Sequence, residues 1–127
     1  MRELYQIKFS SCVWFAFDKN AAWHLERDKE GAWAVKYKSF LGERKKRVSG
    51  SDATALENKL KSLSLDAWET EYEDPLIEDG EEWQLYLQFV DGGEKTVRGQ
   101  NGYPKNWRAF MRLQTWLKKQ VEGAGKR

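Results

Sequence analysis

The chain has very little of the residue types that usually carry covalent or acid–base chemistry. Its 127 residues include one cysteine, Cys12, and one histidine, His24. A single cysteine excludes an intramolecular disulfide, and we expect the reducing environment of a cytoplasmic protein. Because Cys12 begins the apolar run 12–15, we expect its thiol to be buried and inert. His24 has no neighbouring cysteine or repeated aspartate that would indicate a metal site or a general base.

Long hydrophobic runs and the spacings of familiar catalytic motifs are also absent. No apolar segment approaches the length that spans a membrane, and no basic-then-apolar leader opens the sequence. Nucleophile-elbow, phosphate-loop, dinucleotide-binding and zinc-binding spacings do not occur. We therefore expect a protein without catalytic activity, cofactor, metal or membrane association.

What the chain has in abundance is tryptophan. Only 40% of the residues are hydrophobic and 33% are charged, so a compact core depends on large rings, each of which buries ~150–250 Å². The spread of the tryptophans along the chain predicts an aromatic core rather than one binding cage. They are Trp14, Trp23, Trp33, Trp68, Trp83, Trp107 and Trp116.

The net charge of +2 conceals three blocks of opposite sign. Residues 1–64 hold 13 Lys/Arg against 8 Asp/Glu, residues 65–97 hold 1 against 11, and residues 98–127 hold 8 against 1. Such blocks either pair inside the fold or form opposed fields on its surface. We leave both alternatives open.

Residues 1–64 alternate in the way that predicts an antiparallel meander followed by a helix. Apolar side chains recur at every second position in 3–10, 23–26 and 33–38, a continuous apolar run covers 13–17, and a shorter strand is expected at 44–48. Leucines at helical spacing predict a helix over 53–62. Ser51 or Asp52 is its expected cap.

Residues 65–122 predict a strand with one aromatic and one acidic face over 68–73, then a hairpin and a helix. The hairpin strands are 83–89 and 95–98, joined by the turn Asp91-Gly92-Gly93. Pro104 fits the first turn of the final helix. Its wide apolar stripe indicates burial on two sides or contact with another copy.

The expected fold class is therefore α+β: an antiparallel β-meander followed by a helix, then a β-hairpin unit followed by a C-terminal amphipathic helix. We expect a single domain over 1–127, divided into 1–64, 65–122 and a flexible tail at 123–127. Whether the two units share one sheet is left open.

The loop 99–107 and the helix that follows form the first candidate site. Glycines allow close backbone approach, amide side chains can bind backbone or ligand, and the helix start offers free N–H groups. A protein partner or a small polar or anionic ligand is expected there, although the same residues can simply lock the hairpin to the helix. The candidate residues are Asn101, Tyr103, Lys105, Asn106, Arg108 and Arg112.

A basic segment forms the second candidate, a nucleic-acid surface. Its cations are Lys36, Lys38, Arg44, Lys45, Lys46 and Arg47, with Trp33, Tyr37 or Phe40 available to stack on bases. The alternative is that these cations protect an exposed strand edge. In the acidic block, Glu69, Glu71 and Glu73 share one strand face. Neighbours on such a face stand ~6.6 Å apart, too far for all three carboxylates to bind one ion.

The second half of the chain resembles a known bacterial domain. The pattern is Trp68, Tyr72, Asp79-Gly80-x-x-Trp83-x-Leu85-x-Leu87, Asp91-Gly92 and Gly99-x-Asn101-x-Tyr103-Pro104-x-Asn106-Trp107-x-x-Phe110. It is similar, over residues 66–117, to a small domain of uncharacterised proteins from Firmicutes and their mobile elements. The resemblance implies no activity, but it favours a role in phages or defence. We therefore expect a non-catalytic binding module, such as an inhibitor or sponge that a phage or mobile element encodes and that acts on a host defence component.

Overall fold

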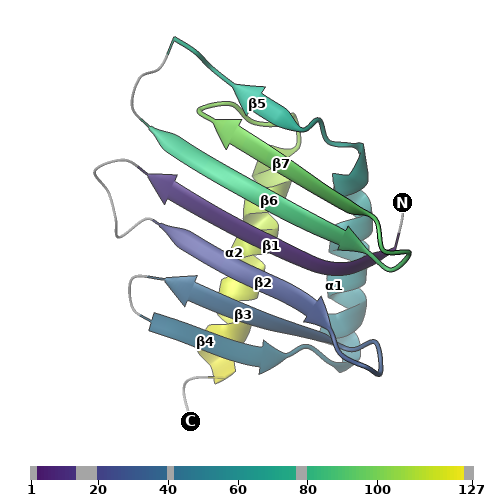
Figure 1. Ribbon diagram of the computed structural model, residues 1–127. Coiled ribbons are helices and arrows are strands. Elements are labelled where there is room, and N and C mark those ends of the chain that lie inside the picture. The colour runs from purple at the N-terminus through teal and green to yellow at the C-terminus, as the bar shows by residue number, and fades with distance from the viewer. Residues whose placement is uncertain (1–2, 14–19, 40–41, 77–79, 125–127) are drawn as a thin grey trace.

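The computed structural model describes residues 3–13, 20–39, 42–76 and 80–124. It is an α+β fold of one sheet and two long helices (Figure 1). The strands are β1 (Leu4–Val13), β2 (Ala21–Arg27), β3 (Trp33–Ser39), β4 (Gly42–Arg47), β5 (Glu71–Glu73), β6 (Glu81–Phe89) and β7 (Glu94–Gln100). The helices are α1 (Gly50–Leu63), the short 3-10 helix η2 (Leu65–Ala67) and α2 (Trp107–Ala124).

All seven strands belong to one sheet, in the order β4-β3-β2-β1-β6-β7-β5. The first strand in sequence, β1, occupies the centre and pairs with β2 on one side and β6 on the other. Neighbouring strands run antiparallel except β5 and β7, which are parallel. The meander and the hairpin therefore join through β1–β6, which answers the question that the sequence left open.

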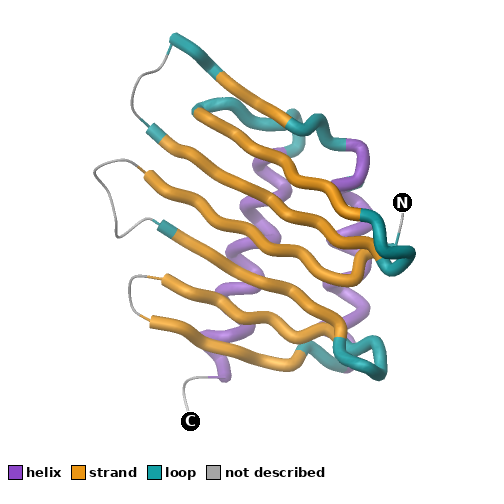
Figure 2. The backbone as a smooth tube through the Cα atoms, viewed as in Figure 1, coloured by secondary structure: helices purple, strands orange, loops and turns teal. Residues whose placement is uncertain are grey.

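Both long helices cover the same face of the sheet, and the described residues leave the opposite face uncovered (Figures 1 and 2). We call that uncovered side the open face. None of the helices in the described ranges combines the length and apolar character needed to cross a membrane.

The core lies between the helices and the inward side chains of the sheet. Strand alternation sends Phe9, Trp23 and Trp83 inward, where each is almost fully buried. Phe110 of α2 is fully buried against them, with ring centroids 5.1 Å from Phe9 and 5.7 Å from Trp23. Trp68 meets Trp83 edge to face at 6.1 Å. The predicted tryptophan-rich core is thus confirmed for the described residues.

Several local predictions need correction. Cys12 is exposed, because period-two alternation places it on the open face rather than in the core. Helix α1 begins at Gly50 with Ser49 as its N-cap, earlier than the expected Ser51 or Asp52. Pro104 precedes α2, which begins at Trp107. Of the expected run 13–17, only Val13 lies within the described residues, where it ends β1.

The predicted strand at 68–73 is shorter than expected. Trp68 ends the 3-10 helix, and only Glu71–Glu73 form a strand. Tyr72 is half-buried and contacts Trp83, while Glu71 and Glu73 are exposed. The separation of an aromatic side from an acidic side is therefore confirmed over three residues.

Candidate functional site

The open face carries its side chains in rows, because antiparallel pairing sets residues of neighbouring strands directly opposite one another. One row crosses the four meander strands. Lys8 of β1 lies opposite His24 of β2, His24 opposite Lys36 of β3, and Lys36 opposite Lys45 of β4. On the other side of Lys8, the row continues to Tyr86 of β6.

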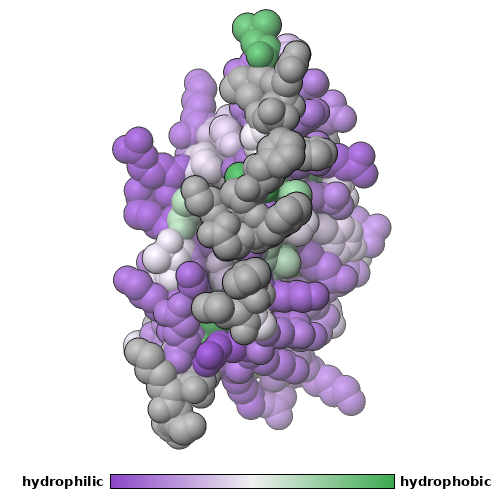
Figure 3. Space-filling view, turned by 90° about the vertical axis from the view of Figure 1, so that its left-hand side faces the viewer, coloured by the Kyte–Doolittle hydropathy of each residue, from purple (hydrophilic) through white to green (hydrophobic). Residues whose placement is uncertain are grey.

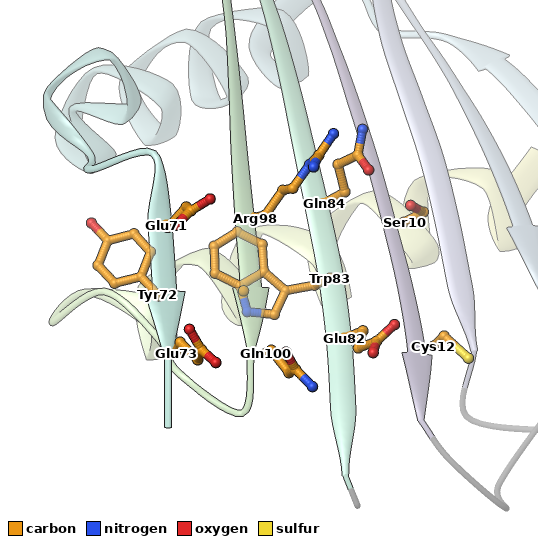
Figure 4. Close-up of a pocket in the computed structure, with 11 residues that line it drawn as sticks. Ser10, Cys12, Glu71, Tyr72, Glu73, Glu82, Trp83, Gln84, Arg98 and Gln100 are labelled. Atoms are coloured by element: carbon orange, nitrogen blue, oxygen red, sulfur yellow. The ribbon is translucent and has the colours of Figure 1, made fainter. Parts of the chain in front are cut away.

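Two further rows cross the other half of the face (Figure 4). The first runs Glu71, Arg98, Gln84, Ser10, and the second runs Glu73, Gln100, Glu82, Cys12. These residues line an open depression of about 450 Å³. A second depression of about 490 Å³ lies over the meander strands and shares Ser10 and Gln84 with the first. The two depressions therefore adjoin each other across the sheet.

The charges on this face are separated by sign. We call the outward side chains of β1–β4 the basic half and those of β5–β7 the acidic half. The basic half carries Lys8, Lys36, Lys38, Lys45 and Arg47, against Glu26 and Glu43. The acidic half carries Glu71, Glu73, Glu82 and Glu94, against Arg98. The charge blocks could either pair inside the fold or form opposed fields on its surface. The open face shows the second arrangement.

Contacts within the basic half neutralise its cations only in part. Lys36 Nζ lies 3.5 Å from a Glu43 carboxylate oxygen, and Lys8 Nζ lies 5.9 Å from the centroid of the Tyr86 ring. His24 Nε2 lies 2.8 Å from the Gln6 amide oxygen. Burial lowers the pKa of His24 below its usual value, and the charges of Lys8 and Lys36 act in the same direction against Glu26.

The structure divides the predicted nucleic-acid residues between two faces. Lys36, Lys38, Lys45 and Arg47 occupy outward positions on the open face. Arg44 and Lys46 occupy the alternate positions on the helix side, where Lys46 Nζ lies 3.5 Å from the Gln120 amide oxygen. Arg47 also pairs with two carboxylates, at 3.5 Å to Asp28 and 3.2 Å to Glu30.

Two of the three expected stacking residues are not available to bases. Trp33 and Tyr37 are buried in the core, at 2% and 7% exposure, because the alternation that sends Lys36 and Lys38 outward sends the rings inward. Phe40 lies outside the described residues. The prediction that Trp33 or Tyr37 stacks on bases is therefore wrong.

The loop 99–107 uses its amide side chains to hold the structure together. Asn101 adopts a left-handed conformation, and its side-chain oxygen accepts a hydrogen bond of 2.9 Å from the Glu81 N–H. Asn106 donates a 2.8 Å hydrogen bond to the carbonyl of Leu63, the last residue of α1. Tyr103 donates to the Glu81 carboxylate at 2.9 Å.

These contacts give the loop a structural explanation. Burial and the Glu81 carboxylate raise the pKa of Tyr103 to about 12, so its hydroxyl remains a donor at neutral pH. Lys105, Arg108 and Arg112 are exposed, and both arginines belong to α2, the helix that covers the other face of the sheet. The six predicted residues therefore comprise three that tie the loop and three exposed cations.

The sequence reasoning missed the contributions of Lys8, Tyr86, Glu82 and Arg98 to the open face. Their outward positions follow from the alternation of β1, β6 and β7, which was recognisable. What was not recognisable is that β1 lies between the two halves of the chain, so that these residues become neighbours.

The described surface offers little apolar area for recognition. Its exposed large hydrophobic residues are Leu76, Val90 and Tyr103, which lie in separate loops. A side view of the molecule shows a mostly hydrophilic surface (Figure 3). Among the described residues, no group of three or more His, Cys, Asp or Glu side chains is placed to hold a metal ion.

Comparison of the chain with protein-family models, with curated proteins and with solved structures found no match. A functional assignment therefore depends on the residues and the geometry described above.

Proposed function

We propose that this chain is a non-catalytic module that binds a protein partner through its open face. The observation that supports the proposal is an uncovered sheet surface whose charges are divided into a basic and an acidic half. A partner with the opposite arrangement gains attraction at both ends and meets like charges if it binds in reverse. The divided charge thus sets the orientation of the partner as well as its rate of association.

The positions of the reactive side chains support a binding role over catalysis. Cys12 and His24 both belong to the open face, but His24 lies opposite Lys8, four residues from Cys12 along β1. At strand rise, four residues correspond to about 13 Å. That separation is far beyond the hydrogen-bond reach that a thiol and its general base require.

The resemblance of residues 66–117 to a domain of mobile elements suggests the biological setting. In that setting the partner is a host defence component, and the chain is its inhibitor or sponge. A divided charge pattern suits this role, since an inhibitor has to find one partner among many proteins.

Two matched variants test the proposal. Lys38→Glu/Lys45→Glu reverses two exposed cations of the open face, and Arg108→Glu/Arg112→Glu reverses two on α2. Both change the net charge equally. Tagged wild type and both variants are used to capture proteins from cells of the source organism, and a partner is identified by mass spectrometry and then titrated. We expect the sheet variant to bind at least tenfold more weakly and the α2 variant to bind like wild type.

The opposite ranking would place the partner on α2, in agreement with the first candidate site from the sequence. Equal affinity of all three proteins would contradict the proposal. Because all four residues are exposed, melting temperatures of the variants close to wild type are the control for folding.

A nucleic-acid-binding function is a second candidate, favoured by the row of cations across β1–β4. Two of the cations proposed from the sequence, Lys36 and Lys45, are joined there by Lys8, and Lys38 lies in the next outward row. Affinity for a single-stranded oligonucleotide should then fall steeply with salt, since each neutralised phosphate releases counterions. Fluorescence anisotropy at low salt is the measurement, and an unchanged signal excludes this candidate.

A further inference from the structure

The row of cationic side chains on the basic half has an energetic cost. Lys36 lies directly opposite Lys45, and Lys8 lies two strands from Lys36, on the other side of His24, whose lowered pKa favours the neutral ring. Like charges in such positions destabilise a sheet. Glu43 offsets part of the cost, at 3.5 Å from Lys36, and Lys8 lies over the face of the Tyr86 ring, at 5.9 Å. A fold that carries this repulsion without a structural gain indicates a functional use for it.

The same side chains converge on the depression of about 490 Å³ in the basic half. Its lining includes Lys8, His24, Lys36 and Lys38 from three strands, together with Glu43 and Tyr86. Neighbouring strands are ~4.8 Å apart. Lys8 and Lys36 are two strands apart, so their backbones are separated by ~9.6 Å, and their long side chains can reach different oxygens of one anion that carries several phosphate groups.

We propose that this depression binds the phosphate groups of a polyphosphate-bearing ligand, with Lys8 and Lys36 as its principal contacts and His24 between them. Charge-assisted hydrogen bonds from lysine to phosphate oxygens are stronger than neutral ones. The bound anion would replace repulsion between the cations with attraction to a shared partner. This proposal does not rest on a protein partner, because a small anion can occupy the basic half by itself.

His24 gives the proposal a pH signature. The groups that face its ring are Lys8 on β1, Glu26 on β2, Lys36 on β3 and Tyr86 on β6, with Glu43 at the far side of Lys36. In the free protein, burial and the two lysines favour the neutral imidazole. A bound polyanion favours the protonated ring instead, so binding takes up a proton. Affinity should therefore rise as the pH falls from 8 to 6.

The direct test uses inorganic triphosphate as the probe, with ionic strength held constant by NaCl. Wild type, Lys8→Gln/Lys36→Gln and the control Lys118→Gln/Lys119→Gln are compared by calorimetric titration and by melting temperature. The control removes two exposed cations from α2. We expect wild type and control to bind triphosphate and to melt at higher temperature in its presence. Loss of two charge-assisted contacts should weaken triphosphate binding at least tenfold in Lys8→Gln/Lys36→Gln.

A second readout separates a binding role from a merely structural one. Without triphosphate and at low salt, Lys8→Gln/Lys36→Gln should melt at a higher temperature than wild type, because the repulsion has been removed. Equal triphosphate binding by Lys8→Gln/Lys36→Gln and the control would overturn the proposal. Absence of triphosphate binding to wild type would also overturn it. His24→Gln should lose the increase in affinity between pH 8 and pH 6, and retention of that increase counts against the proposal.

Two further probes identify the source of the phosphates. If ATP binds as tightly as triphosphate or more tightly, the ligand is a nucleotide. If an oligo(dT) strand binds more tightly than either and its affinity falls in Lys38→Glu/Lys45→Glu, the phosphates belong to nucleic acid. Capture of a protein partner by the open face is measured separately, so the proposed function can fail while triphosphate binding holds, and the reverse.

Discussion

At the scale of single residues, Lys95 shows how a charged side chain can serve the fold rather than a ligand. Alternation along β7 turns it toward the helix side of the sheet. There its ammonium group donates to the carbonyl of Asp66 at 2.9 Å and to that of Trp68. These carbonyls lie at the end of the 3-10 helix, where backbone acceptors lack partners within the helix.

Replacement of Lys95 by methionine tests this explanation. The apolar stem is kept, but two partly buried carbonyls lose their donor, so the free energy of unfolding should fall by about 1–3 kcal/mol. Urea denaturation monitored by tryptophan fluorescence is the measurement. Lys118→Met, an exposed site on α2, is the control and should stay within about 0.5 kcal/mol of wild type. An equal loss in both variants would contradict the role of Lys95.

His24 gives a second prediction, for the unliganded protein. Its pKa is lowered in the folded state, so below pH 6.5 the unfolded chain binds more protons than the folded one. The free energy of unfolding should therefore decrease as the pH falls from 6.5 through the folded-state pKa. Chemical denaturation at several pH values, with His24→Gln as reference, isolates this contribution. Parallel pH profiles for the two proteins would show that His24 makes no such contribution.

At the scale of elements, the loop after β7 is held against β5 by a close backbone contact. A Cβ atom added to Gly102 would lie 2.4 Å from the Glu73 backbone nitrogen, which cannot move aside without disturbing β5. Gly102 also accepts a 3.0 Å hydrogen bond from the Trp83 indole. We expect Gly102→Ala to lower the free energy of unfolding by about 1–3 kcal/mol through overpacking. Urea denaturation measures the loss. The control is Gln100→Ala, at an exposed position near the same end of β7. An equal loss in the control would show that any substitution at this strand end destabilises the protein, and would contradict the overpacking explanation.

Helix α1 is joined to the sheet by a polar cluster around Glu57. Its carboxylate accepts hydrogen bonds from Arg27 at 2.9 Å and from the Trp33 indole at 2.7 Å, while Arg27 also donates to the Leu4 carbonyl. Glu57→Ala leaves two partly buried donors without this acceptor. We expect a loss of about 2–3 kcal/mol in thermal or urea unfolding, against less than about 0.5 for the exposed Asn58→Ala.

The elements differ in how far the sequence could predict them. Residues 83–89 and 33–38 alternate over most of a strand, so β6 and β3 were recognisable from one segment alone. The three residues of β5 are too few to show a period, and their parallel pairing with β7 depends on a distant partner. Cys12 was misplaced for a related reason: an apolar run does not reveal which of its members face outward.

At the scale of the whole molecule, the two halves of the sequence complete each other. Strand β1 belongs to residues 1–64, yet one of its edges pairs with β6 from Leu4–Phe89 to Val13–Glu81. Helix α2, from the second half, covers inward residues of the meander, where Trp23 donates to Gln114 at 3.1 Å. Each half alone would expose a hydrophobic surface and an unpaired strand edge.

We therefore expect the fragments 1–64 and 65–127 to be unfolded or aggregated when they are expressed separately. The whole chain should unfold in one transition, with coincident curves from circular dichroism and tryptophan fluorescence. Two resolved transitions, or a stable fragment with native-like circular dichroism, would show that the halves are independent folding units.

The candidate site could be predicted only in its parts. The charge blocks and the outward positions of Lys36 and Lys38 were visible in the sequence. Their arrangement was not, because it requires the order of strands and the fact that both helices cover one face. The loop around Asn101 attracted attention for the opposite reason: its specialised residues serve backbone contacts that only the folded chain reveals.

The central position of β1 also has a consequence for synthesis of the protein. The strand leaves the ribosome before its partner β6, which is about 70 residues behind it. At typical translation rates of about 5–20 residues per second, one edge of β1 waits roughly 4–14 seconds for its neighbour. During that interval the nascent chain exposes a strand edge and the inward face of the meander. Slow translation or a crowded polysome should therefore lower the yield of native protein, even though the free energy of unfolding of the completed chain is unchanged.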